Sequence, residues 1–234
     1  MKKTISLLLM SLMGLVGTYA WADSNREDTV ERMQKSVDVL SEIMATPDKG
    51  IPEEVLSSAK CILVVPNLIK GGFIFGAKHG RGVASCRTSN GWSAPAFVSV
   101  GGGSWGLQIG VEGVDLVMLV MNDHGLQHML SSKFKIGADA SASAGPVGRH
   151  ASAGTDWKME SEILTYSRSK GIFAGISLDG AVVEQDKDST RAIYGRDTSF
   201  RATLAGNVRA PESTRAFIRA VTSAARTSAV AEAN

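Results

Sequence analysis

The sequence is poor in the residues that build metal clusters and has no excess of charge of either sign. It contains two cysteines and four histidines among 234 residues, too few for a cysteine-rich metal site. Basic and acidic residues nearly balance, at 25 against 23, whereas general nucleic-acid binding needs a strong positive field. After residue 22 no long apolar run is unbroken, since 107–121 carries Glu112 and Asp115. In residues 23–234 we therefore expect no metal, no cofactor, no nucleic-acid partner and no membrane span.

The N-terminus has the order of segments found in a cleavable secretory signal peptide. Two lysines precede the apolar run 5–16, and Ala20-Trp21-Ala22 supplies the small residues that signal peptidase requires. The run is shorter than the roughly 20 residues of a membrane span. We expect residues 1–22 to be removed near Ala22, and the remainder to reach the periplasm of a bacterial envelope or to be secreted. Cleavage removes both lysines and leaves 23 basic residues against 23 acidic ones.

The spacing of apolar residues changes along the chain from helical to strand-like. Apolar residues at three- and four-residue steps over 30–44 predict an amphipathic helix that ends near Thr46-Pro47. Pro52 opens a short helix that runs to about Lys60. Further helices are expected at 124–131, 188–194 and 211–228. The predicted strands are 61–65, 72–78, 82–87, 92–100, 104–112, 114–121, 134–144, 155–159, 163–168, 172–178 and 181–184.

Strands this close together leave no room for crossover helices and predict an antiparallel meander. The expected turns are Pro66-Asn67, His79-Gly80, 89–91, 101–103 and Gly113. Glycine within strands favours a strongly bent sheet or small barrel, or a site for a bulky ligand. We expect a single α+β domain over 23–234 that is mainly antiparallel β, with an N-terminal helix and a C-terminal helix.

The two cysteines, Cys61 and Cys86, both lie in strand-like runs. An oxidising periplasm permits a disulfide between them. Burial as two small apolar residues fits equally well. The sequence gives no distance between the two positions, so both interpretations stay open.

The glycine-rich stretch 101–110, GGGSWGLQIG, fits three motifs whose required context is missing. A dinucleotide fingerprint and a nucleophile elbow at Ser104 both need a following helix, but residues 107–110 alternate as a strand. A membrane helix-packing motif needs a membrane helix. We interpret the stretch as a glycine-rich turn that enters a strand. A serine hydrolase that uses Ser104 is only a distant alternative for the function of the protein.

Two histidines, His124 and His128, stand four residues apart on a predicted helix, a spacing at which two imidazoles can share a metal. A zinc hydrolase would carry Glu at position 125, where this chain has Gly. We interpret the pair as partly exposed polar residues beside the apolar Leu126, Met129 and Leu130, and not as a metal site.

The sequence GPVGRH, which begins at Gly145, is the best candidate for anion binding. Its turn presents backbone N–H groups around Gly145 and Gly148, and Arg149 offers a bidentate fork for phosphate or carboxylate. An ion pair of Arg149 with Asp139 or Asp156 in a tight turn is the alternative.

Other basic residues could add to an anionic site or be simply solvated. Lys60 and Lys70 flank the first predicted strand. From Arg201 to Arg226 the chain has five arginines against one acid, Glu212. Basic amphipathic helices lie on anionic membranes, although an ordinary surface helix with a solvated arginine face has the same pattern.

Taken in order, several short motifs resemble those of the SYLF domain family. They are AKCILVVP at 59–66, KGGF at 70–73, GRG at 80–82, GWSAP at 91–95, GLQIG at 106–110, GAD at 137–139, AGPVGR at 144–149, YS at 166–167, KGIFAG at 170–175 and YG at 194–195. The resemblance extends over about residues 27–206. The chain departs from the family at Cys61, where a small residue such as Gly or Ala is expected.

The resemblance implies binding and not catalysis. SYLF proteins, the yeast actin-patch members among them, bind phosphoinositides and related anionic lipids, and some bind actin filaments. An exported copy meets no actin, so we expect it to bind an anionic phospholipid or similar envelope amphiphile. The residues expected to bind it are Lys60, Lys70, Gly145, Gly148 and Arg149. An envelope structural or interaction protein without a small ligand, self-associating through a sheet edge, is the second alternative.

Overall fold

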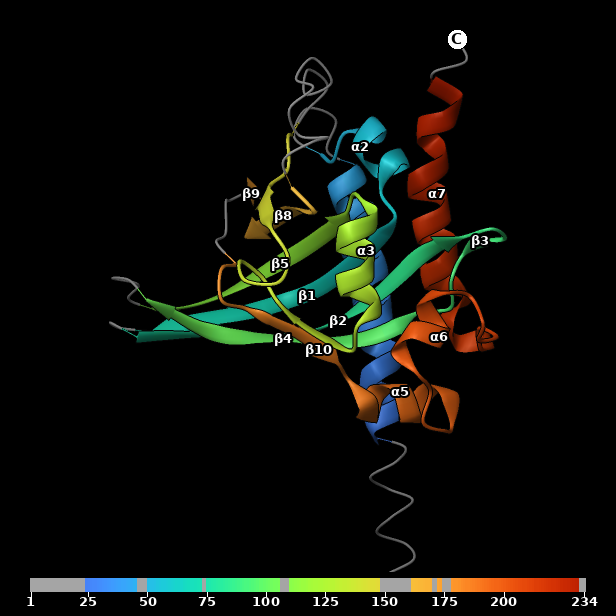
Figure 1. The fold of residues 1–234 in the computed structure, drawn as a ribbon, viewed down its shortest axis with the longest axis horizontal. Coiled ribbons are helices and arrows are strands. Elements are labelled where there is room, and N and C mark those ends of the chain that lie inside the picture. The colour runs from blue at the N-terminus through green and yellow to red at the C-terminus, as the bar shows by residue number, and fades with distance from the viewer. Residues whose placement is uncertain are drawn as a thin grey trace, which may run out of the picture.

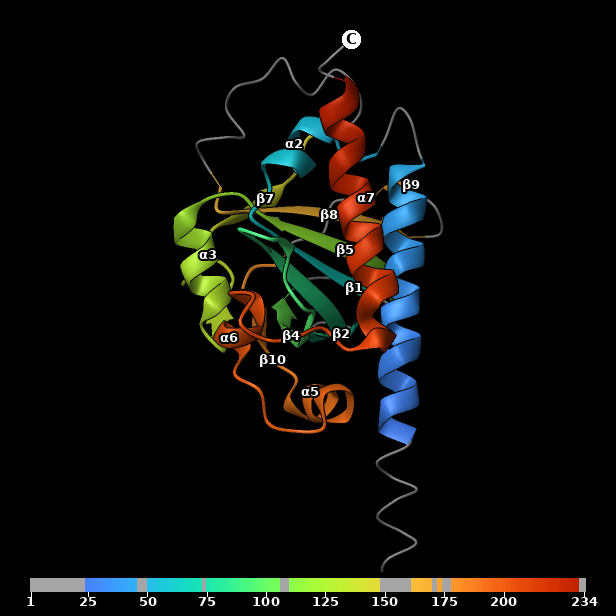
Figure 2. The ribbon, with the colours of Figure 1, turned by 90° about the vertical axis from the view of Figure 1, so that its right-hand side faces the viewer.

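The computed structural model describes residues 24–45, 50–72, 75–105, 110–147, 161–169, 172–173 and 178–231. Its strands are β1 Cys61–Gly72, β2 Phe75–Thr88, β3 Gly91–Trp92, β4 Ala96–Trp105, β5 Gly110–Val120, β6 Lys133–Lys135, β7 Ala142–Ala144, β8 Ile163–Ser169, β9 Ile172–Phe173 and β10 Val182–Gln185. The main order in the sheet is β6-β10-β4-β2-β1-β5-β8-β7, while β3 pairs with β2 and β9 with β8. All ladders among these strands are antiparallel except that of β7 with β8. Helices flank both faces of the curled sheet, which confirms the expected α+β class (Figures 1 and 2).

Two long strands replace the shorter ones predicted from 61 to 87. The turn expected at Pro66-Asn67 is wrong: these residues form a bulge inside β1, where the register to both neighbouring strands shifts. Asn67 has φ 54°, and its N–H donates to Asp115 Oδ1 at 3.1 Å. The turn expected at His79-Gly80 is also wrong, because Gly80 lies within β2, where a Cβ would stand 2.7 Å from Val65 Cγ1. Here glycine allows two strands to approach and does not end one.

The connection from β4 to β5 also departs from the predicted meander. β4 pairs with β2 and β5 with β1, so the chain passes from one side of the β1–β2 hairpin to the other. The expected turns at 101–103 and Gly113 lie inside β4 and β5, whereas the turn before Gly91, with φ 110°, is confirmed. The predicted strand 134–144 is interrupted by a turn between β6 and β7, and 155–159 lies outside the described residues.

The described helices are an N-terminal helix over 24–44, α2 Glu53–Ser58, α3 Asp123–Leu130, α5 Lys187–Tyr194, α6 Phe200–Leu204 and α7 Arg215–Ala231. The C-terminal helix predicted at 211–228 is shifted: Pro211 precedes a 3-10 turn, Glu212–Thr214, and the α-helix begins only afterwards. α6 was not predicted; the Ser199 side chain caps its first turn. Among the described helices, none combines the length and hydropathy of a membrane span.

Two apolar cores lie on opposite faces of the sheet. On one face the N-terminal helix, α2 and α7 pack against alternate residues of β1, through side chains such as Leu40, Leu56 and Phe217. On the other face α3 and α6 pack against the remaining residues of the same strand, through Met129 and Phe200. Because β1 is covered on both faces, its first five residues form a continuous apolar run instead of an alternating one.

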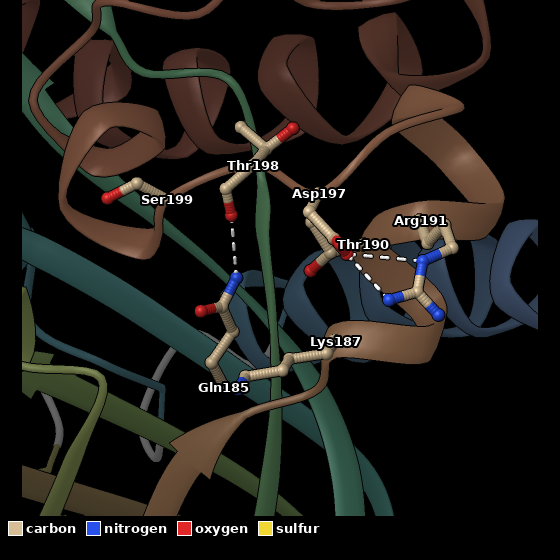
Figure 3. Close-up of a pocket in the computed structure, with 7 residues that line it drawn as sticks. All are labelled: Gln185, Lys187, Thr190, Arg191, Asp197, Thr198 and Ser199. Carbon is tan, nitrogen blue, oxygen red and sulfur yellow. Dashed lines mark hydrogen bonds and ion pairs between the residues drawn. The ribbon is translucent and has the colours of Figure 1, made fainter.

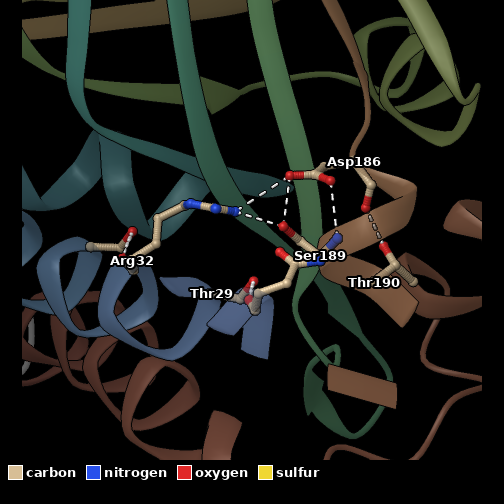
Figure 4. Close-up of polar contacts among 7 residues, drawn as sticks. Thr29, Arg32, Asp186, Ser189 and Thr190 are labelled. Atoms are coloured by element: carbon tan, nitrogen blue, oxygen red, sulfur yellow. Dashed lines mark hydrogen bonds and ion pairs between the residues drawn. The ribbon is translucent and has the colours of Figure 1, made fainter. Parts of the chain in front are cut away.

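A buried polar network attaches α5 to the N-terminal helix (Figure 4). Arg32 donates to Ser189 Oγ at 2.9 Å, and its guanidinium lies 3.4 Å from Asp186 Oδ2. Asp186 also caps α5, since its Oδ1 accepts the Ser189 N–H at 3.0 Å. Burial lowers the pKa of Arg32; Asp186 opposes this shift, and nearby Arg81 adds to it.

A second ion-paired group, centred on Arg168 of β8, fixes the other end of the N-terminal helix. Arg168 pairs with Glu42 of that helix and, at 3.3 Å, with Asp115 of β5. Its side chain is 13% exposed, so solvent screens these pairs less than it would at the surface.

The structure joins Cys61 and Cys86 in a disulfide between directly opposed residues of β1 and β2, which decides between the two interpretations of the cysteines. The bridge closes a loop with a sequence separation of 25 residues, for which the chain-entropy model gives about 3.5 kcal/mol.

We therefore expect reduction, or the double substitution Cys61→Ala with Cys86→Ala, to lower the free energy of unfolding by about 2–4 kcal/mol. Urea denaturation with and without reductant measures the loss, and thiol titration of the unfolded protein reports the oxidation state. The double variant is the control, because reductant should not change its midpoint. A wild-type midpoint that is also insensitive to reductant would contradict the prediction.

Candidate functional site

One end of the sheet extends beyond the helices. In Figure 1 the ends of β1, β2, β4 and β5 run out past the N-terminal helix and α7. The pairing register places eight residues of these strand ends on one face of the sheet. It is the same face that the N-terminal helix and α7 cover over the rest of the strands. The eight residues are Ile69, Gly71, Ala77, His79, Gly101, Gly103, Val111 and Gly113. We call this uncovered surface the glycine face.

The glycine face carries exposed apolar side chains. Ile69 is 47% exposed and Val111 81%, and they are two of the four large apolar side chains exposed in the described chain. Their backbones occupy neighbouring strands, because Ile69 pairs with Gly113 two residues from Val111. Exposed apolar side chains on neighbouring strands of one face are typical of an interaction surface.

Among the described residues, nothing gives two of its glycines a packing reason. Apart from its neighbours in the chain, a Cβ at Gly101 would come no closer than 3.8 Å to a described atom, and one at Gly103 no closer than 3.9 Å. Gly102, which points to the opposite face, differs, because its Cβ would lie 2.9 Å from the Ala181 Cα. Glycine weakens a strand, so glycine at 101 and 103 suits a surface that another molecule approaches closely.

Basic side chains lie at the inner border of the glycine face. His79 and Arg81 are both exposed, and strand alternation puts them on this side of β2. No ion pair of Arg81 is found within the described part of the chain. Lys78 points to the opposite face, where it is 7% exposed and burial lowers its pKa, although Asp179 opposes that shift.

The lysines predicted to bind an anion do not share a site. Lys60 pairs with Asp123 at 2.8 Å, and Lys70 pairs with Glu112 at 3.1 Å. They stand at opposite ends of β1, on the order of 30 Å apart at the rise of an extended strand. Lys70 also faces away from the glycine face.

Gly145 packs against a tyrosine, while Gly148 and Arg149 lie outside the described residues. The Gly145 N–H donates to Thr165 O at 3.0 Å and is therefore not free to bind an anion. A Cβ at this position would stand 2.1 Å from Cζ of Tyr166, so glycine is needed for the close packing. Asp139, considered as a partner of Arg149, accepts the Lys135 N–H at 2.7 Å within its own turn.

Sequence reasoning missed an open pocket of about 380 Å³ near α5 and α6 (Figure 3). Its lining is polar, and Asp197 holds the Arg191 guanidinium through bonds of 2.7 and 3.1 Å. Gln185 donates to Thr198 O at 2.9 Å across the pocket. All seven residues that line the pocket have polar or charged side chains, and none is an apolar residue.

Ser104 is an extended residue of β4, opposite Gly76 of β2. A nucleophile elbow needs the serine at a sharp turn between a strand and a helix. Because β4 continues through Ser104 to Trp105, the backbone there does not form that elbow.

Comparison with known proteins relates the chain to one family. Residues 101–224 match the family described as "Ysc84: Las17-binding protein actin regulator". The rat SH3 domain-containing YSC84-like protein 1 is 31% identical over 192 residues, 80% of this chain and 56% of the rat protein. Protein YSC84 of Saccharomyces cerevisiae is 32% identical over 182 residues, 76% of this chain and 39% of the yeast protein. The chain spans about half the length, or less, of these curated relatives.

The contrast between adjacent glycines of β4 can be tested by stability alone. We expect Gly103→Val to leave the free energy of unfolding within about 0.5 kcal/mol of wild type, since the nearest described atom to its Cβ, Gly76 O at 3.9 Å, is in ordinary van der Waals contact. Gly102→Val should lower it by about 1–3 kcal/mol, because the side chain meets the Ala181 backbone. If urea denaturation shows that both variants lose the same free energy of unfolding, Gly103 is packed against other residues and the prediction is wrong.

Tyr166, which is buried, and Tyr194, which is partly buried, provide a matched pair. Tyr166 OH has no hydrogen-bond partner among the described residues, whereas Tyr194 OH donates to Pro95 O at 2.6 Å. Tyr166→Phe should preserve or raise stability at pH 7, and Tyr194→Phe should lower it by about 1 kcal/mol. Denaturation of both variants at pH 7 measures the difference.

The same pair predicts a loss of stability in alkali. Burial raises the pKa of both Tyr166 and Tyr194 above the usual value near 10. The unfolded chain therefore loses these protons first, and stability should fall as the pH rises above about 10. In each Phe variant this fall should be shallower, and an unchanged slope in both would contradict the prediction.

Proposed function

Because this chain belongs to the Ysc84 (SYLF) family, we propose that it binds the surface of an anionic phospholipid membrane, or a similar envelope amphiphile, without catalysing a reaction. The observation that carries the proposal is the glycine face, a sheet surface with exposed apolar side chains at Ile69 and Val111, where glycines 101 and 103 serve no packing among the described residues. The relatives are named as SH3 domain-containing and Las17-binding proteins, not as enzymes, which supports a binding role.

The apolar part of the ligand would lie on the glycine face. Full burial of an Ile or Val side chain contributes about 1.5–3 kcal/mol, so Ile69 and Val111 together can hold a weak membrane contact. With no Cβ at residues 101 and 103, acyl chains can approach the backbone of β4 closely.

The charged part of the ligand would lie at the inner border, at Arg81 and His79. A basic residue near an anionic lipid surface contributes about 1 kcal/mol, and Arg binds phosphate through two parallel bonds. Few cations are involved, so binding should weaken only moderately with salt. This assignment replaces Lys60 and Lys70, which are held in ion pairs.

The sequence of the N-terminus supports a proposal about where the protein acts. Residues 1–22 have the sequence of a signal peptide, so we propose export to the periplasm or secretion. The family description names actin regulation, but an exported chain would meet no actin. Envelope phospholipids are then the anionic surface available to it.

Co-sedimentation with liposomes tests the proposal. The purified protein should bind vesicles containing phosphatidylglycerol or cardiolipin and bind phosphatidylcholine vesicles less. The double substitution Ile69→Ser with Val111→Ser should weaken binding by at least about tenfold, as expected for a loss of 1.4 kcal/mol or more. Gly103→Val and Arg81→Gln should each weaken it as well.

Lys60→Gln is the matched control, because it removes a charge at the far end of β1 and should leave binding unchanged. Equal binding by all variants would overturn the assignment to the glycine face. Failure of the wild type to bind any anionic vesicle would overturn the lipid function. Light scattering tests self-association. If the wild type is a dimer and the double substitution Ile69→Ser with Val111→Ser dissociates it, the glycine face is instead a surface for self-association.

A further inference from the structure

Three metal-ligating side chains meet between α3 and the start of β8. His124 and His128 lie one turn apart on α3, and Glu162 immediately precedes β8. One ligand atom from each lies within 4.8 Å of the other two. We propose that His124, His128 and Glu162 bind a divalent transition-metal ion of the zinc class. The proposal is independent of the lipid function.

Backbone packing brings the third ligand to the two histidines. The Met121 N–H donates to Glu162 O at 2.9 Å, which fixes the start of α3 beside Glu162. Gly125 is buried, and its Cβ would lie 2.9 Å from that same oxygen. The glycine that stands where a zinc hydrolase has glutamate thus lets the helix approach the backbone of Glu162.

The carboxylate is oriented by its neighbours. Glu162 Oε1 contacts His124 Nδ1, and Oε2 accepts the Ser141 N–H at 2.9 Å. Ser141 Oγ in turn accepts the Glu162 N–H at 3.1 Å. Outer hydrogen bonds of this kind hold metal-ligating groups in position.

A simple ion pair would account for His124 and Glu162 but not for His128. His128 Nε2 is buried and has no hydrogen-bond partner in the part of the chain that the structure describes. An unsatisfied buried polar atom costs about 1–3 kcal/mol. In the proposed site His128 binds the ion through this nitrogen, which removes the cost.

The donor set selects the class of metal. Two imidazole nitrogens and one carboxylate oxygen suit zinc and its neighbours, whereas calcium and magnesium prefer all-oxygen sites. Bonds of about 2.0–2.2 Å would require the three side chains to close in by small rotations. His124 is 70% exposed, which gives the ion a route in and leaves room for a water as fourth ligand.

No side chain of the cluster stands where the general base of a zinc hydrolase would be, since position 125 is glycine. The ion would instead tie α3 to β8 and act as a structural or sensing site. Cys61 and Cys86 are bonded to each other, so in the oxidised protein their thiols do not compete for zinc.

The test is titration of the purified protein, free of any histidine tag, with Zn²⁺, followed by calorimetry and native mass spectrometry. We expect one bound Zn²⁺ per chain and a rise in melting temperature that EDTA reverses. His124→Gln, His128→Gln and Glu162→Gln should each weaken binding at least about tenfold. Co²⁺ should give the visible absorption of a low-coordinate site that the same variants lose.

His79→Gln and His150→Gln are matched controls that remove a histidine elsewhere and should keep the bound ion. Thermal melting of each variant in EDTA checks that the variant folds. If a histidine variant does not fold, the result for Glu162→Gln decides the test, because the amide oxygen of Gln can still accept the Ser141 N–H. The proposal is overturned if no Zn²⁺ binds, or if binding is equal in wild type and all three cluster variants. Loss of Zn²⁺ in a control variant would likewise place the site elsewhere.

Discussion

Coverage of β1 from both sides is the constraint on which the rest of this structure depends. The first five residues of the strand are buried, with Cys61, Leu63 and Val65 in one core and Ile62 and Val64 in the other. A strand with two apolar faces must lie inside the sheet and have helices above and below it. The neighbours of β1 are accordingly β2 on one side and β5 on the other. Because β4 lies beside β2, the chain passes from one side of the β1–β2 hairpin to the other between β4 and β5.

Apolar packing alone does not fix where the helices stop along the sheet. Arg32 with Asp186 and Arg168 with Glu42 hold the N-terminal helix near its two ends, and each arginine is largely removed from solvent. Breaking such a pair leaves an uncompensated buried charge, which is more costly than the pair itself is favourable. The helix therefore has a defined position, beyond which the sheet continues uncovered as the glycine face.

The sequence was sufficient for the class of fold and most helices, but not for the roles of its glycines. Periodicity identifies a helix over 30–44 because its apolar residues repeat, and a short continuous apolar run marks the strand that begins at Cys61. Glycine carries no such signal: Gly80 permits close strand packing, Gly91 forms a turn and Gly103 leaves a surface bare. Only the neighbouring atoms distinguish these roles. Glu162 was missed as a partner of the histidines for a similar reason, since spacing along a helix cannot reveal a side chain that packs beside it from a distant part of the chain.

The two ends of the central strands differ in how tightly they are held. At one end the Cys61–Cys86 disulfide, the Lys60–Asp123 ion pair and the His–Glu cluster connect β1, β2, α3 and β8. At the other end, roughly 30 Å away along β5, the glycine face has no comparable covering among the described residues. A strand fixed firmly at one end can present a flat surface at the other without losing its register. For that reason an ion bound beside α3 and a ligand on the glycine face would act on separate parts of the molecule, and substitutions at one should leave the other intact.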